Sequence, residues 1–210
     1  MSVGTDHPLE PYGIALLRGG PRAAVTVAVV ALRLRGIVEA GRPGTLRRAA
    51  TADTTESWHP LEKAVRAGLY RPAGIRELLD RTVVDHALTR LRRELTTAGL
   101  LRSALPVLTR AGRRRLAELR QLHPLPAEGN ALPREELVLA VALYGDRALT
   151  AFLPRFTESA GLVGRGRDMR VDEGGHSVSG VTGLGRALRD EMDSGGGGYG
   201  CGGGGGGGGD

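Results

Sequence analysis

The sequence predicts a mainly α-helical fold: two tandem winged-helix-like units of three helices and a small β-hairpin each, then a helical segment and a glycine-rich tail. Three observations predict it. The chain is 40% hydrophobic but only 3% aromatic, so its core must be assembled from Ala, Leu and Val. Apolar residues recur at helical spacing between Pro starts and Gly stops. A helix, a glycine and a candidate hairpin follow one another twice, around Gly36 and Gly99.

The first unit is predicted over residues 1–50. Residues 11–20 form a short apolar helix that Gly19–Gly20 closes, and Pro21 opens the next helix, where its missing N–H costs nothing. That helix ends at Gly36, the residue type best suited to a left-handed C-terminal cap. The stretches "IVEA" and "TLRR" then flank "GRPG" as a hairpin.

The second helix of this unit is too apolar to read DNA. Residues 23–31 are apolar nearly all round, and Arg22, Arg33 and Arg35 lie only at the ends. A recognition helix needs polar side chains that reach base edges. The hairpin therefore resembles a wing in shape, while its helix is predicted to be structural. We expect Val25, Val29 and Leu32 in the buried core.

The second unit is predicted over residues 58–122. Pro60 opens its first helix, residues 74–80 form a short second helix, and residues 82–98 form a third that Gly99 stops. The stretches "LLRS" and "PVLT" form a second candidate hairpin, after which Thr109 caps an Arg-rich helix.

The third helix of the second unit has an apolar stripe and a basic outer face. Val84, Leu88, Leu91 and Leu95 share the stripe, and Arg90 and Arg93 lie outside it. Either the arginines contact phosphate or a partner, or they form a solvated face paired with Asp85 and Glu94. The candidate contact residues are Arg90, Arg93, Arg102, Arg113, Arg114 and Arg115.

The remaining chain divides at a Pro- and Gly-containing linker, residues 123–133. Residues 132–163 are predicted to form a C-terminal helical segment, with acidic residues in its first turn where the helix dipole favours them. Residues 164–210 are predicted to be flexible and end in a poly-glycine tail, which cannot repay its ordering entropy. The single cysteine, Cys201, lies in this tail, so the chain has no disulfide framework and no thiolate metal site.

Charge is distributed unevenly. Residues 1–125 carry a net charge of +10 and residues 126–210 carry −4, which together give the overall +6. A basic front half attracts phosphate, acidic lipid or the protein's own acidic half. All but one of the 29 basic residues are arginine, beside abundant Ala and Gly, which is also the composition that codon bias produces in a GC-rich genome.

The residues give no pattern for catalysis, and we expect no enzyme, no cofactor and no metal site. The five histidines lie far apart, and His7, His59 and His123 each precede a proline, which is typical of a turn. The stretch "GLVGRGRD" lacks the preceding strand and the Lys-Ser/Thr ending of a phosphate-binding loop. The stretch "HSVSG" does not have the spacing of a nucleophile elbow.

We also expect a soluble, cytoplasmic chain with no transmembrane segment. The N-terminal residues lack the apolar core of a signal peptide. The longest apolar run, Ala23–Leu32, is about half of the roughly 20 residues that a membrane helix needs.

The stretches "PYGIALLRGGPRAAVTVAVVALRLRGIVEAG", "HPLEKAV" and "LTRAGRRRLAEL", with the terminal poly-glycine, resemble an uncharacterised family of actinobacterial proteins. The resemblance covers residues 9 to about 160 and the tail. Members carry a Gly-rich, often Cys-rich C-terminus, and many are labelled membrane proteins, which implies association with a membrane. This chain departs from the family between Leu101 and Thr109, where it has no hydrophobic span, and in the tail, which has one cysteine. The family carries no established activity, so no site residue is implied.

Together these observations predict a non-catalytic protein-interaction or scaffolding module with an unidentified protein partner. The alternative is a nucleic-acid-binding winged-helix protein, and the second alternative is a protein that associates peripherally with a membrane surface. A fold of this class serves both binding functions, so the fold alone does not choose between them.

Overall fold

The computed structural model describes residues 9–50, 58–102, 107–126 and 132–163. These residues form eight α-helices and a two-stranded antiparallel sheet, so the prediction of a mainly α-helical protein is confirmed. The elements in chain order are α1 (Pro11–Leu34), β1 (Val38–Ala40), β2 (Leu46–Arg48), α2 (Pro60–Gly68), α3 (Ile75–Leu79), α4 (Thr82–Thr97), α5 (Arg110–Leu122), α6 (Arg134–Tyr144), α7 (Asp146–Phe152) and α8 (Pro154–Ser159).

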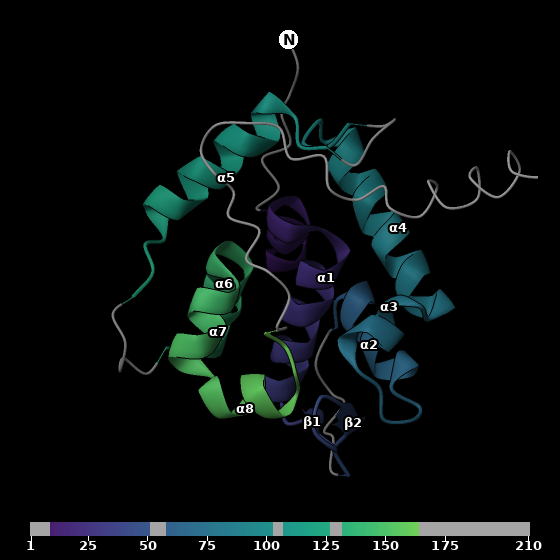
Figure 1. Cartoon of the computed structure of the whole chain (residues 1–210). Helices are drawn as coiled ribbons and strands as arrows, with labels where there is room; N and C mark the ends of the chain where they lie inside the picture. Colours follow the sequence, from purple (N-terminus) through teal and green to yellow (C-terminus); the bar gives the residue numbers. More distant parts are fainter. Residues whose placement is uncertain (1–8, 51–57, 103–106, 127–131, 164–210) are drawn as a thin grey trace, which may run out of the picture. The chain divides into compact units, whose positions relative to one another are not determined.

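Helix α1 is the centre of this helical unit. Helix α6 packs along one side of it, and α2, α3 and α4 pack along the other, as Figure 1 shows. Val25, Val29 and Leu32 are fully buried, so their predicted place in the core is confirmed. The predicted division into two helices at Gly19–Gly20 appears as a kink inside α1, where Gly20 takes a φ of +71° and Pro21 begins the second half.

Helix α1 also has the length and composition of a membrane-spanning helix. It has 24 residues, and its most apolar window has a mean hydropathy of 1.4. In the structure 72% of that window is buried by the other elements. The core helix of a soluble protein has the same character, so this helix is equally consistent with the expected soluble chain.

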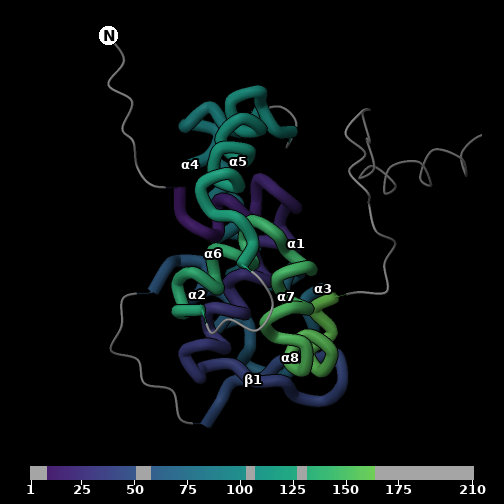
Figure 2. The backbone as a smooth tube through the Cα atoms, turned by 90° about the vertical axis from the view of Figure 1, so that its left-hand side faces the viewer, coloured from purple at the N-terminus to yellow at the C-terminus, as the bar shows by residue number. Residues whose placement is uncertain are grey.

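The predicted first hairpin is present, and it forms backbone hydrogen bonds with two other segments of the chain. Val38 pairs with Arg48 and Ala40 with Leu46 in antiparallel register. Leu46 also forms a bridge with Ala73, which lies between α2 and α3. At the tip, the Gly44 N–H donates to the Ser159 carbonyl across 2.9 Å, which ties the turn to α8. Figure 2 shows the hairpin below α8 at the foot of the unit.

These contacts join the three predicted segments. The described residues belong to one compact unit. Within it, the buried residues of the predicted segments 1–50, 58–122 and 132–163 form one hydrophobic core.

Residues 103–106 of the second predicted hairpin lie outside the described residues, and the residues on either side are joined by a bridge between Leu101 and Leu108. Two local expectations differ from the structure. The described part of the first segment holds one kinked helix and a hairpin, not three helices, because Pro21 continues the helix after the glycine kink. Helix α8 was not expected as a separate helix, and it begins at Pro154, a residue suited to the first helical position. The predicted tail, residues 164–210 with Cys201, and residues 127–131 of the linker lie outside the described residues.

Candidate functional site

Helices α4 and α5 are joined by residues 98–109, of which the structure describes 98–102 and 107–109, and this connection is called the turn below. The two helices form the arms of an inverted V at the top of Figure 1. Helix α4 ends where Gly99 takes a φ of +72°, and the Leu100 N–H donates to the Leu95 carbonyl. The Thr109 hydroxyl then caps α5 by accepting from the Gly112 N–H at 3.0 Å. The same hydroxyl donates to the Gly99 carbonyl at 2.7 Å. Thr109 therefore ties the start of one arm to the end of the other, as an N-cap residue can.

A close backbone approach holds the two arms together. A Cβ atom at Gly112 would lie 2.5 Å from the Leu100 carbonyl oxygen, so only glycine fits here. At the floor of the V, a Cβ at Gly13 of α1 would lie 3.4 Å from a methyl of Leu95. Glycine at position 112 therefore lets α5 approach the backbone of the turn closely, while Gly13 lies in ordinary contact with Leu95.

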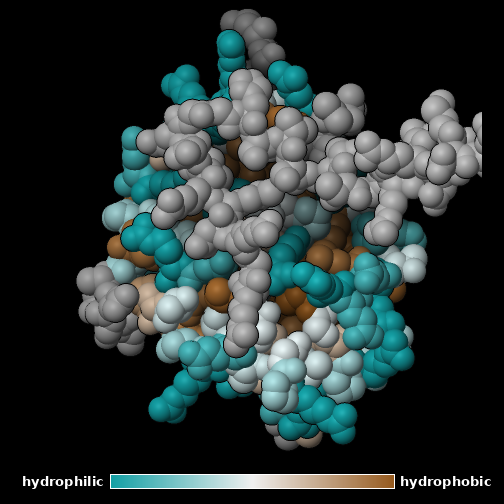
Figure 3. Space-filling model, viewed as in Figure 1, coloured by the Kyte–Doolittle hydropathy of each residue, from teal (hydrophilic) through white to brown (hydrophobic). Residues whose placement is uncertain are grey.

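The space between the arms is a cleft of about 620 Å³. The floor and inner walls of the cleft are apolar, and their residues come from α1, α4, the turn and α5. They are Leu9, Gly13, Leu91, Leu95, Ala98, Leu100 and Ala111, and Pro60 also lines the cleft. Its rim is charged or polar: Glu10, His59, Arg90, Glu94, Arg114, Arg115 and Glu118. Figure 3 shows one face of the molecule, on which brown hydrophobic areas are separated by teal hydrophilic side chains.

The arginines of the rim lie beside carboxylates on their own helices. Arg90 Nε lies 3.0 Å from Glu94 Oε1 on α4, and Arg114 Nε lies 3.0 Å from Glu118 Oε1 on α5. Arg115 also approaches Glu118, at 3.5 Å. The Arg90 and Arg114 side chains remain 70% and 84% exposed, so each pair contributes only about 0.3–0.5 kcal/mol to folding.

The structure divides the six predicted contact residues into two sets. Arg90, Arg114 and Arg115 line the cleft together. Arg93, Arg102 and Arg113 are exposed but lie outside the lining of the cleft. The expected pairing of the basic face with Glu94 is confirmed for Arg90.

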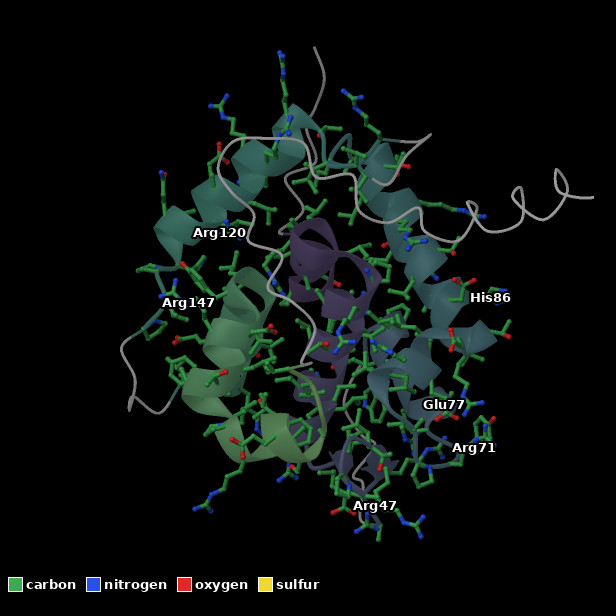
Figure 4. The ribbon with its side chains drawn as sticks, in the orientation of Figure 1. Arg47, Arg71, Glu77, His86, Arg120 and Arg147 are labelled. Atoms are coloured by element: carbon green, nitrogen blue, oxygen red, sulfur yellow. The ribbon has the colours of Figure 1, made fainter. Side chains whose placement is uncertain are left out.

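Arg47 and Arg48 of the first hairpin make contacts within the fold. Arg47, at the foot of Figure 4, pairs with Glu39 across the two strands at 3.0 Å. Arg48 donates to the Arg66 carbonyl at 2.8 Å and so caps the end of α2. The middle of α1 is buried, and the tip of the hairpin contacts α8.

A buried polar network that sequence reasoning missed lies directly behind the cleft. The Glu62 carboxylate is fully buried in α2 and accepts from the Tyr12 hydroxyl at 2.8 Å. Its second oxygen lies 2.9 Å from Arg35 and also accepts from the His59 N–H. Burial raises the pKa of Tyr12, and the negative charge of Glu62 raises it further. Tyr12 therefore serves as a hydrogen-bond donor at neutral pH.

His59 joins this network to the rim of the cleft. Its ring stacks on Tyr12 with the ring centroids 4.1 Å apart. Nδ1 accepts from the Leu61 N–H at 3.1 Å, and Nε2 lies 3.1 Å from Glu10 Oε2. The neutral ring therefore carries its proton on Nε2 and donates it to Glu10. Burial lowers the pKa of His59 and outweighs the opposing effect of Glu10 and Glu62.

The sequence contained one signal for this network. His59-Pro-Leu-Glu62 has the spacing of a capping box, in which the N-cap side chain and the residue three positions later satisfy one another's backbone N–H groups. The expectation that His59 belongs to a turn at a helix start agrees with its position as the N-cap of α2. Among the residues that the structure describes, no group of three His, Cys, Asp or Glu side chains is placed to hold a metal ion.

Comparison with protein-family models found no matching family, and comparisons with curated proteins and with solved structures found no match either.

Proposed function

We propose that this chain is a non-catalytic protein-interaction module and that the cleft between α4 and α5 is its binding surface. The observation that supports this proposal is the combination of an apolar floor with a rim of both charges. Protein interfaces commonly have an apolar centre and a polar border. The volume of about 620 Å³ would also suit a small ligand, so the chemistry of the rim is the stronger argument.

The balance of charge on the rim argues against a polyanion in the cleft. Three arginines, Arg90, Arg114 and Arg115, face three carboxylates from Glu10, Glu94 and Glu118. A nucleic-acid backbone would meet attraction and repulsion in equal measure here, whereas phosphate contact depends on a cationic surface.

Residues 58–122 are proposed to be a winged-helix-like unit used for protein binding. In support, α2, α3 and α4 precede a short bridged turn, which is the order of a winged helix. The competing proposal is that this unit binds nucleic acid through Arg93, Arg102 and Arg113, which are exposed outside the cleft. We rank it second because the cleft provides both apolar and charged contacts, while these three residues provide only positive charge.

A pair of tryptophan variants tests the proposal. A display library of helical peptides is selected on the wild-type chain, and each enriched peptide is then measured against Ala111→Trp and Ala117→Trp. Ala111 and Ala117 are both exposed on α5, but only Ala111 lines the cleft. We expect Ala111→Trp to weaken binding at least tenfold and Ala117→Trp to leave it unchanged. Peptides that bind both variants as tightly as the wild type would contradict the proposal.

A further inference from the structure

Tyr70 is an exposed tyrosine held by two arginines, in the loop that joins α2 to α3. Its side chain is 63% exposed. The guanidinium groups of Arg81 and Arg71 lie 4.7 and 5.7 Å from the centre of its ring, and the Tyr70 hydroxyl accepts a hydrogen bond from Arg81 Nη1. Figure 4 labels Arg71 and Glu77, which lie close together in this cluster. The phenol is therefore presented to solvent with its oxygen already in contact with a cation.

The two arginines share a single carboxylate oxygen. Arg81 Nη2 lies 2.6 Å and Arg71 Nη2 lies 3.1 Å from Oε1 of Glu77. Two positive charges therefore meet one negative charge beside the Tyr70 hydroxyl. In the described part of the chain, the Nε of Arg81 is also the one buried side-chain nitrogen or oxygen atom without a hydrogen-bond partner. Because each guanidinium has five N–H donors, the cluster has donors left for a second anionic group.

The hydroxyl of Tyr70 differs from those of the other two tyrosines that the structure describes. The Tyr12 side chain is buried, and its hydroxyl donates to Glu62. The Tyr144 hydroxyl donates to the His123 carbonyl at 2.8 Å. The Tyr70 hydroxyl only accepts, from Arg81, and among the described residues no acceptor is bonded to its own proton. Its oxygen is therefore the one of the three that is both exposed and not committed as a donor within the fold.

We propose that Tyr70 is a site of phosphorylation and that Arg71 and Arg81 bind the phosphate once it is attached. The co-reactant is a nucleoside triphosphate held by a tyrosine kinase. The Tyr70 oxygen attacks the γ-phosphorus and forms the new O–P bond, while the bond from that phosphorus to the β,γ-bridging oxygen breaks. The nucleoside diphosphate leaves, and the hydroxyl proton passes to a base of the kinase. Tyr70 does not line the cleft, so this inference does not depend on the proposed function.

A phosphate on Tyr70 has two advantages over Glu77 as an acceptor for the arginines. It carries a charge of about −1.5 to −2 at pH 7 and three acceptor oxygens, whereas a carboxylate carries a single charge. It is also attached beside the Arg81 guanidinium, which gives it a high effective concentration that a free anion lacks. The Glu77 side chain is 43% exposed, so it is able to turn toward solvent when the arginines change partner.

The exchange of acceptors changes which helices Arg81 connects. Arg81 directly precedes the first turn of α4, and with Glu77 as its acceptor it is tied to α3. With a phosphate on Tyr70 as its acceptor, it is tied to a residue that follows the end of α2. Phosphorylation should therefore hold the loop between α2 and α3 against the start of α4 and stabilise the folded chain, as a phosphate opposite an arginine cluster does.

The full chain with phosphotyrosine incorporated at position 70 during translation tests whether the arginines bind the phosphate. We expect its melting temperature to lie about 2–6 °C above that of the unmodified chain, because about one to three charge-assisted hydrogen bonds form. By phosphorus-31 NMR, the pKa of the phosphate should lie below that of the same phosphotyrosine in an unfolded peptide, since the arginines favour the dianion. Arg71→Gln, at a 61% exposed position, should reduce both shifts by at least half. Arg76→Gln, exposed on α3 outside the cluster, is the matched control and should keep them.

Treatment of the folded chain with a broad-specificity tyrosine kinase domain, ATP and Mg²⁺ tests whether the hydroxyl accepts a phosphate. Mass spectrometry follows the modification of each tyrosine with time. We expect Tyr70 to be phosphorylated at least tenfold faster than Tyr12 and Tyr144, whose hydroxyls are bonded within the fold.

Three outcomes would overturn the proposal. The first is phosphorylation of Tyr70 no faster than that of Tyr144. The second is a melting temperature and a phosphate pKa that phosphorylation of Tyr70 leaves at their reference values, which would show that the arginines remain on Glu77. The third is a lower melting temperature of the phosphorylated chain, which would show that repulsion by Glu77 outweighs the attraction of the arginines.

Discussion

The Tyr12 hydroxyl donates a hydrogen bond to Glu62 across 2.8 Å inside the helical unit, although the two residues are 50 positions apart in the chain. This bond connects the first turn of α1 to the first turn of α2, and the same carboxylate accepts from the backbone of His59. It therefore positions the start of α2 beside one end of the cleft.

Loss of the Glu62 carboxylate should destabilise the protein strongly. Glu62→Ala removes the acceptor of the Tyr12 hydroxyl and the carboxylate that pairs with Arg35, and removing one partner of a buried pair costs about 3–5 kcal/mol. Tyr12→Phe removes one bond to a charged group and should cost less, about 1.5–3 kcal/mol. Urea unfolding measures both variants, with Glu158→Ala on the exposed face of α8 as the control. A loss below about 1 kcal/mol in Glu62→Ala would contradict the role of this carboxylate.

Stability should fall in mild acid because of His59. Burial lowers its pKa in the folded state, so the unfolded chain takes up a proton first as the pH falls through about 6.5. Protonation of Nδ1 also removes the acceptor of the Leu61 N–H. The stabilisation is present above pH 6.5 and is lost progressively below it, down to the lowered pKa of the folded state.

Two asparagine variants isolate this effect. His59→Asn keeps an acceptor at the N-cap but does not titrate, so its free energy of unfolding should change less between about pH 7 and 5. His86→Asn removes a histidine that is exposed on α4, labelled in Figure 4, and should behave as the wild type does. Identical pH profiles for the wild type and His59→Asn would refute the assignment.

Gly112→Ala should destabilise the protein even though alanine is the better helix former. At an exposed helical position this change would stabilise by about 1 kcal/mol. Here the new Cβ would meet the Leu100 carbonyl oxygen, and we expect a net loss of about 1–3 kcal/mol by thermal or urea unfolding. Ala117→Gly, at an exposed position of the same helix, measures the effect of helix propensity alone. We expect it to lower the free energy of unfolding by about 1 kcal/mol. A more stable Gly112→Ala variant would show that the two arms are not held by this contact.

Binding to duplex DNA at different salt concentrations separates the proposed function from its rival. Four to six phosphate contacts would give a slope of about −4 to −5 for log affinity against log salt, since each contact contributes about 0.9. If the second unit binds DNA, Arg90→Ala with Arg93→Ala should reduce the steepness of that slope by up to about 2. The interaction module instead predicts weak DNA binding at physiological salt and no difference for the double variant. Sequence-selective binding that survives physiological salt, and that the double variant loses, would favour the nucleic-acid proposal.

Several helix limits followed from the sequence because their signals are local. Pro60, Thr109 and Pro133 mark helix starts through the geometry of the first turn, and the glycines after α1 and α4 mark helix ends. The stripe Val84, Leu88, Leu91 and Leu95 is buried as its spacing predicts. Each of these signals lies within a few residues of the feature that it predicts.

The candidate site was only partly predictable because it depends on approaches between distant segments. The same sequence pattern gave one expectation for six arginines, yet three of them line the cleft and three do not. The difference depends on how α1, α4, the turn and α5 approach one another, which the local sequence does not determine. The bond from Tyr12 to Glu62 and the bridge from Leu46 to Ala73 have no local signature. For this reason, segments that the sequence predicts as separate units share one hydrophobic core in the structure.

The packing of α6 against α1 has a consequence for the synthesis of this protein on the ribosome. About 100 residues of chain separate the end of α1 from the start of α6. At a synthesis rate of about 5–20 residues per second, the nascent α1 waits roughly 5–20 seconds for its partner to be translated. During that interval the face of α1 that packs against α6 has no native cover, so apolar side chains that are buried in the folded protein stay exposed on the growing chain.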